Sequence, residues 1–236
     1  MGNFSIKVER FLEAFIDNGG YHNVVLGLKN TMSIAVIGLI IGILIGTVIA
    51  SIRVLPKYKT LPRVLDKICT FYVAVFRGTP MVVQLLVFYY VLLPLFGVKM
   101  DGIDVSTIVF GLNSGAYVSE IMRGGILSID PGQMEAGRSV GLPFSAAMLK
   151  IVIPQAIKNI LPTLGNEFIT LVKETSIVSF VGAMDLYKVF NDIGTNTYEF
   201  MVPYLVMAII YIVIVCVISL GIKIMERSLR KSDRRS

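Results

Sequence analysis

The sequence predicts an all-α membrane protein with five transmembrane helices. Of its 236 residues, 55% are hydrophobic and 16% are charged, whereas soluble domains carry about 25% charged residues. The apolar residues form long runs, and basic residues lie between those runs and at the C-terminus. We therefore expect one polytopic membrane domain over residues 1–236, with the N-terminus outside and the C-terminus in the cytoplasm. The net charge of +6 then indicates loops held at an anionic lipid leaflet and not a nucleic-acid partner.

Residues 1–30 are expected to form an N-terminal interfacial segment. Apolar residues at positions 4, 8, 11, 12 and 15 follow the helical period, with polar residues opposite, so a short helix should lie on the membrane surface. The first span follows at residue 31, because about 20 uncharged residues can cross roughly 30 Å of hydrocarbon. Gly38, Gly42 and Gly46 share one face of this span, which would let a second helix approach closely. Whether that helix belongs to the same chain stays open.

The segment after the first span marks the cytoplasmic side, because it is short and basic. A second apolar stretch runs from about residue 68 to residue 98 and is interrupted by Arg77-Gly78-Thr79-Pro80. Pro80 removes a helical hydrogen bond and disfavours helix at the residue before it. We expect a lead-in segment, a kink near the inner boundary, and then a span that ends near Phe96.

The third span, from about residue 105 to residue 127, carries polar side chains. Asn113, Tyr117 and Glu120 share one helical face. A carboxylate inside a span costs about 2.5–3.5 kcal/mol on insertion scales, so Glu120 should face protein or water. Arg123, one turn further on, or Arg77 could pair with it. A structural ion pair and a ligand contact both stay open for Glu120.

The fourth span, from about residue 161 to residue 181, is the most polar, and we expect it to line a water-filled path. Asn166, Thr170 and Lys173 share one face, and Glu167 and Glu174 share another. Residues 183–200 should return as a loop on the outside. The last span, from about residue 204 to residue 224, is uniformly apolar and should face lipid, and the basic tail after it should lie inside.

Residues 128–160 form a polar segment that the alternation of spans places in the cytoplasm. Within it, residues 133–154 read QMEAGRSVGLPFSAAMLKIVIP, with a break at Gly141-Leu142-Pro143 between two helix-forming stretches. Gly141 permits a turn, and Pro143 suits the first position of a helix. Such a segment lies outside the bilayer, where it either binds a partner or only connects two spans.

Enzymatic chemistry has little support in this sequence. His22 is the only histidine, so a zinc site built from histidines is excluded. The nucleophile elbow, the C-x-x-C pair and the phosphate-binding P-loop do not occur. The chain should therefore not hydrolyse ATP alone, and we expect no cofactor or metal on it.

The polar segment resembles the EAA motif of ABC importer permeases. The family pattern is E-A-A, three residues, G, nine residues, I, one residue, L-P. This chain has Glu135-Ala136-Gly137, Gly141, Ile151 and Ile153-Pro154 at that spacing, with Gly137 for Ala and Ile153 for Leu. Three further segments resemble the polar amino acid uptake branch of the family: 76–80 with Gln84; 116–117 with Glu120, 123–125 and 132–133; and 164–169 with 173–176. The resemblance covers roughly residue 23 to the end.

The resemblance implies a type I importer fold and a set of partners. In this family the segment forms two short helices that dock in a cleft of a cytoplasmic ATPase, which holds the ATP and Mg²⁺. A second permease subunit, identical or different, and an extracellular or periplasmic amino acid-binding protein complete the complex in the bacterial plasma membrane. ATPase closure would rock the spans between inward-open and outward-open states. The implied coupling residues are Glu135, Ala136, Gly137, Gly141, Leu142 and Pro143.

The substrate should then pass between the two permease subunits. A polar amino acid needs polar partners there, because desolvating unpaired charges costs several kcal/mol. Glu167 could pair with the side chain of arginine, lysine or histidine, or with Lys173 or another internal cation. Two other classes stay open: a secondary transporter driven by an ion gradient, and a membrane assembly protein without a substrate. The expected lining is Asn113, Tyr117, Asn166, Glu167 and Thr170.

Overall fold

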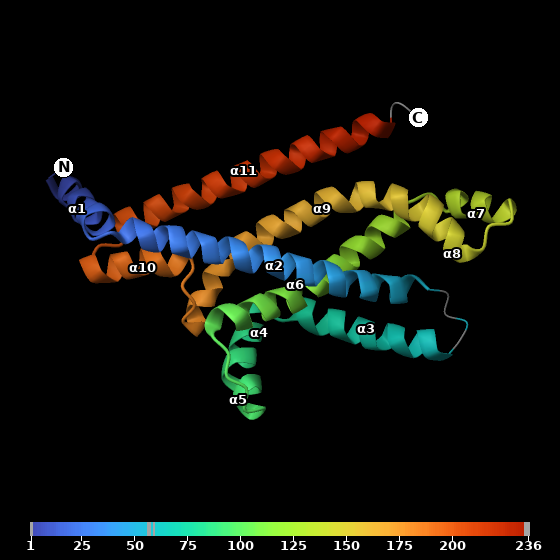
Figure 1. Ribbon diagram of the computed structural model, residues 1–236, viewed down its shortest axis with the longest axis horizontal. Helices are drawn as coiled ribbons and strands as arrows, with labels where there is room; N and C mark the ends of the chain where they lie inside the picture. Colours follow the sequence, from blue (N-terminus) through green and yellow to red (C-terminus); the bar gives the residue numbers. More distant parts are fainter. Residues whose placement is uncertain (1, 56–57, 59, 234–236) are drawn as a thin grey trace.

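The computed structural model describes residues 2–55, 58 and 60–233, and every regular element in them is helical (Figure 1). The long helices are α2 (Gly20–Val54), α3 (Thr60–Gly78), α6 (Gly102–Leu127), α9 (Ile153–Glu174) and α11 (Met201–Asp233). The short helices are α1 (Gly2–Leu12), α4 (Met81–Val87), α5 (Leu93–Leu95), α7 (Pro131–Ser139), α8 (Phe144–Ala147) and α10 (Leu186–Thr197). The π-helical turns η1 (Glu13–Asp17), η2 (Phe88–Leu92) and η3 (Met148–Val152) and the 3-10 turn η4 (Thr175–Val181) join neighbouring helices.

The long helices run lengthwise through the molecule, and α6 lies at its centre (Figure 1). α6 packs against α2, α3 and α9, and α11 packs against α9. The C-terminal end of α2, the start of α3, and α7 and α8 lie at one end, whereas α1 and α10 lie at the other. We call the first the basic end, because Arg53, Arg63 and Arg138 lie on these elements and Lys150 lies on η3, which directly follows α8.

The closest helix pair is α2 with α6. Gly38, Gly42 and Gly46 are buried, and a Cβ at Gly42 would lie 2.6 Å from Ser114 Oγ. A Cβ at Gly46 would lie 2.7 Å from Val118 Cγ1, so the contacts advance together along two parallel helices. The predicted close approach is therefore confirmed, and its partner belongs to the same chain.

The number of spans is lower than the sequence predicts when helices are judged by length and apolar composition. Among the described residues, Gly20–Val54, Phe144–Val181 and Met201–Leu229 meet that test. The bent pair Thr60–Gly78 and Met81–Leu95 would add a fourth if it counts as one span. α6 is long enough, at 26 residues, but its polar side chains keep it out of that group. The five-span arrangement with the N-terminus outside stays a prediction.

Two helix boundaries bear on what the sequence predicts. The first long helix begins at Gly20 and not at residue 31, because Gly19 at φ 71° ends the preceding turn and the helix restarts directly. The predicted kink at Pro80 is present as a sharp break, since the two segments meet at 106°. Pro80 is extended, at φ −63° and ψ 139°, and precedes α4 as its N-cap. The second apolar stretch is therefore a broken span or a re-entrant segment.

At the end opposite the basic end, the structure differs from the predicted surface helix and outside loop. Residues 186–197 form α10, and the side chain of Asp185 caps it by accepting from Lys188 N at 2.8 Å and Tyr187 N at 3.1 Å. Phe11 of α1 is buried in a cluster with residues of α2, α10 and α11. Part of the apolar face of α1 thus packs against protein, while Phe4 and Ile16 are exposed.

Candidate functional site

The segment between α6 and α9 forms two short helices with a tight turn, as predicted. Asp130 caps α7 by accepting from Gly132 N at 2.8 Å. At the other end, Gly141 adopts φ 88°, its N–H donates to Arg138 O at 3.0 Å, and Leu142 N donates to Gly137 O at 3.2 Å. These two bonds around a left-handed glycine are the standard way to end a helix, so the turn is built by local sequence.

The coupling candidates divide into an outer and an inner group. Gly137 is buried, because a Cβ there would meet Ile151 Cδ1 at 2.7 Å and Ala147 Cβ at 3.3 Å. Leu142 is half-buried. The outer group holds one large apolar side chain that sequence reasoning missed, Val140, which is 79% exposed at the tip of the turn. An apolar residue inside a polar turn was the signal for it. The exposed candidates are Glu135, Ala136, Gly141 and Pro143.

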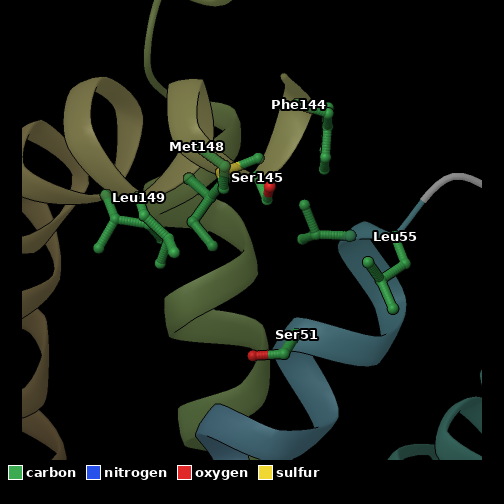
Figure 2. A pocket seen from close by; sticks show the side chains of 9 residues that line it. Ser51, Leu55, Phe144, Ser145, Met148 and Leu149 are labelled. Atoms are coloured by element: carbon green, nitrogen blue, oxygen red, sulfur yellow. The ribbon is translucent and has the colours of Figure 1, made fainter. Parts of the chain in front are cut away.

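A cavity of about 210 Å³ separates α8 from the bundle. In Figure 2, Phe144, Ser145 and Met148 line it from one side, and Ser51 and Leu55 of the α2 end line it from the other. The lining is mostly apolar, and the cavity lies between α8 and the end of α2. The two coupling helices are thus held mainly through α6 and α9, to which the chain joins them.

Glu120 is the centre of an ion-pair cluster. Its carboxylate pairs with Arg123 Nη2 at 2.8 Å, with Arg53 Nη1, and with Arg77 Nη1 at 4.0 Å. Both predicted partners are present, and sequence reasoning missed Arg53 because it lies 67 residues away on α2. The structural reading of Glu120 as an ion pair is the one that these contacts favour.

Lys173 does not join an ion pair among the described residues, contrary to its prediction as a candidate. It follows Glu167 by six residues, which turns the two side chains about 120° apart around a helix. Lys173 is exposed, while Glu167 is turned towards α6 and accepts a hydrogen bond of 3.1 Å from Ser114 Oγ.

Asn113 does not line an open path, which corrects its prediction. It is 5% exposed, and its Nδ2 donates to Gln84 Oε1 at 2.9 Å. Gln84 Nε2 in turn donates to Phe76 O at 2.8 Å and Thr79 O at 3.0 Å. The last carbonyls of a helix lack partners within it. These two side-chain amides therefore provide hydrogen-bond donors for the carbonyls where α3 ends.

The other predicted lining residues are accessible. On α9, Asn166 and Thr170 are exposed on the same face as Lys173, and Thr170 Oγ1 donates to Asn166 O at 3.1 Å. On α6, Tyr117 is 37% exposed, and the Arg77 guanidinium lies 5.3 Å from its ring centroid.

The structure brings these groups together from two helices. Tyr117 follows Ser114 by three residues and Asn113 by four, so on the α6 surface it lies one turn beyond the contacts with α9 and with the α3–α4 break. Glu167 borders the exposed face of α9 and meets Ser114. Tyr117, Glu167, Asn166 and Thr170 therefore form one accessible polar strip, which we call the α6–α9 strip.

Comparison with known proteins gives one consistent result. Residues 38–231 match the family of binding-protein-dependent transport system inner membrane components. The chain is 40% identical over 210 residues to the arginine transport system permease protein ArtQ of Bacillus subtilis, covering 89% of this chain and 94% of that protein. It is 35% identical over 204 residues to the L-cystine transport system permease protein TcyB of Bacillus subtilis, covering 86% and 85%. A crystal structure of an amino acid ABC transporter with histidines superposes with a TM-score of 0.82 at 38% identity, covering 88% of this chain and 94% of that one.

Proposed function

From the premise that this chain belongs to the family of binding-protein-dependent transport system inner membrane components and is a permease component of an amino acid ABC importer, we propose that it couples ATP hydrolysis on a separate cytoplasmic subunit to the uptake of polar amino acids. The observation that carries the proposal is the two-helix segment α7–α8. It projects from the basic end and exposes Val140, an apolar side chain that a partner surface would cover.

Coupling would act through α7 and α8. The exposed group Glu135, Ala136, Val140, Gly141 and Pro143 would contact the ATPase, while Gly137 and Leu142 would keep α7 against α8 and η3. Movement of the two docked helices would pass to α6 and α9, which the segment joins. The cavity beneath α8 leaves room for such a shift. The spans would then alternate between two open states.

The α6–α9 strip would line the substrate path. Polar side chains exposed at membrane depth need protein or water over them, and a second permease subunit would enclose that water. Glu167 would pair with a cationic side chain such as that of arginine, lysine or histidine. This preference draws support from the carboxylate at the edge of the strip and from the similarity to an arginine transport permease.

The remaining parts of the proposal follow from the family. ATP and Mg²⁺ would bind the ATPase subunits and not this chain. A second copy or a related permease would complete the membrane part, and an amino acid-binding protein would dock at the end that carries α1 and α10. The chain would be a multi-pass protein of the bacterial plasma membrane with five spans.

The test is reconstitution of the permease with its ATPase and binding protein in proteoliposomes. We expect ATP hydrolysis that rises with loaded binding protein and L-arginine uptake that depends on ATP. Val140→Asp should abolish both by placing a charge in the docking contact, whereas Val140→Thr, which keeps the branched shape, should retain most of each.

Two results would contradict the proposal. Uptake by this chain alone, driven by an ion gradient and indifferent to Val140→Asp, would identify a secondary transporter. A complex that assembles normally and imports none of the L-amino acids would identify a membrane assembly protein.

A further inference from the structure

Arg77 is the least compensated charge of the Glu120 cluster. Its only ion pair within the described part of the chain is the 4.0 Å contact with Glu120, and none of the hydrogen bonds found there comes from its guanidinium. Glu120 itself is already bound by Arg53 and Arg123. One carboxylate thus faces three guanidinium groups, and five N–H donors of Arg77 remain to be satisfied.

This charge lies at membrane depth. Ser114 contacts Gly42, which is near the middle of the uncharged residues 31–52. Tyr117 is one turn further, about 4.5 Å along the helix axis, and Arg77 lies over its ring. A charged side chain near the bilayer centre is costly unless it meets water or an opposite charge. The side chain of Arg77 is nevertheless 45% exposed.

The guanidinium is held at the α6–α9 strip. A distance of 5.3 Å to the Tyr117 ring centroid is within the range for attraction between a cation and an aromatic face. That ring is itself exposed and belongs to the strip. The arrangement fixes the position of the guanidinium, while its N–H groups make no hydrogen bond to any residue that the structure describes.

We propose that Arg77 binds the α-carboxylate of the amino acid substrate and that Tyr117 holds the guanidinium in place for this contact. The inference rests on the proposed function and assigns a second recognition group to the same path. A planar guanidinium matches a carboxylate with two parallel hydrogen bonds. Every α-amino acid carries this group whatever its side chain, so Arg77 would read the common part of the substrate and Glu167 the variable part.

A pair of ligands that differ only in the carboxylate tests this assignment. The purified permease–ATPase complex in nanodiscs is heated with L-arginine or with agmatine, which is arginine without its carboxylate. For the wild type, we expect L-arginine to raise the unfolding temperature at a concentration about tenfold below that of agmatine, a difference of about 1.4 kcal/mol in binding. For Arg77→Gln, the two ligands should act at the same concentration, which a purely structural role of Arg77 would not produce.

Uptake with saturating loaded binding protein gives the second measurement. Arg77→Gln should lower the maximal rate of L-arginine uptake about tenfold or more, and Arg77→Lys should recover part of it because the charge returns without the fork. Tyr117→Ala removes the aromatic face that holds the guanidinium and should lower the maximal rate in the same direction. Arg123→Gln is the matched control from the same cluster, and its ligand discrimination should equal that of the wild type.

The outcomes separate the two proposals. If the wild type imports L-arginine but L-arginine and agmatine stabilise it equally, or if Arg77→Gln keeps the discrimination, the carboxylate assignment is wrong while the importer function stands. Dissociation of the permease pair in Arg77→Gln would assign Arg77 to the subunit interface and would also overturn it. If the wild type imports no L-amino acid with ATP and binding protein present, the proposed function itself fails.

Discussion

Ser114 on α6 donates a hydrogen bond of 3.1 Å to Glu167 on α9, at the level where Gly42 of α2 touches Ser114. The hydroxyl fixes one oxygen of the carboxylate from the protein side. The other oxygen has no hydrogen bond in the described residues. The fold therefore positions Glu167 by a hydrogen bond and not by an ion pair with any described residue.

Glu167→Gln should change selectivity without changing the fold. Glutamine can still accept the hydrogen bond from Ser114, but the negative charge is lost. We expect the ratio of L-arginine to L-glutamine uptake to fall about tenfold, which corresponds to about 1.4 kcal/mol. Competition uptake in proteoliposomes measures this ratio. Glu174→Gln is the control, because it removes a carboxylate about two turns further along α9, and it should leave the ratio unchanged. An unchanged ratio in Glu167→Gln would show that Glu167 does not pair with a cationic substrate.

Gly42→Ala should loosen the α2–α6 pair. Its Cβ would lie 2.6 Å from Ser114 Oγ, 2.7 Å from Ser114 Cβ and 3.1 Å from Ser114 C, so the helices must separate. Overpacking of this kind costs about 1–3 kcal/mol, which thermal unfolding in detergent would detect. Gly124→Ala is the control on α6, because a Cβ there meets nothing within 4 Å. Equal unfolding temperatures for the two variants would show that the close approach is not needed.

Gln84→Leu should destabilise the chain around the break between α3 and α4. The substitution removes the hydrogen bonds that the Gln84 amide makes with Phe76 O, Thr79 O and Asn113 Nδ2, and it leaves Phe76 O and Asn113 Nδ2 only their mutual bond of 3.3 Å. Each buried polar group without a hydrogen bond costs about 1–3 kcal/mol, so we expect a lower unfolding temperature and a break that opens more readily to hydrogen exchange. Asn166→Leu, at an exposed site, is the comparison. A Gln84→Leu protein as stable as wild type would mean that water or lipid headgroups replace these bonds.

Docking of α1 should depend on pH through Glu199. The hydrogen bond from Lys7 at 3.1 Å is the main cause that lowers the pKa of Glu199. Because the pKa is lower in the folded state, this contact stabilises the docked helix above the unfolded pKa of about 4.3 and is lost as pH falls through the folded value. A fluorophore at Ser5→Cys, with Cys69 and Cys216 replaced by serine, would report release of α1 on acidification. Glu199→Gln should remove the dependence, and an identical acid transition in that variant would assign it to another group.

Much of the local structure could be predicted from the sequence. The helical turn at Gly141 and Pro143 depends on residues within one turn of each other, so its shape followed from their types. The close approach at Gly42 followed from the spacing of glycines along one face. The sequence identified the span that becomes α6 as one that carries polar side chains, but not its position between α2, α3 and α9, because burial is set by neighbouring helices and not by composition.

What only the tertiary structure decided is which polar side chains are left accessible. Asn113, Tyr117 and Glu120 share one face of α6. Asn113 is hydrogen-bonded to Gln84 and Glu120 is ion-paired with Arg53, so of the three only Tyr117 has an accessible side chain without such a partner. The sequence by itself determined that this chain is a helical membrane protein with a two-helix segment of importer type, because periodicity and turn chemistry act over a few residues. The membership of the α6–α9 strip depended on contacts between side chains 29 to 67 residues apart, whose free energies arise only once the helices are packed.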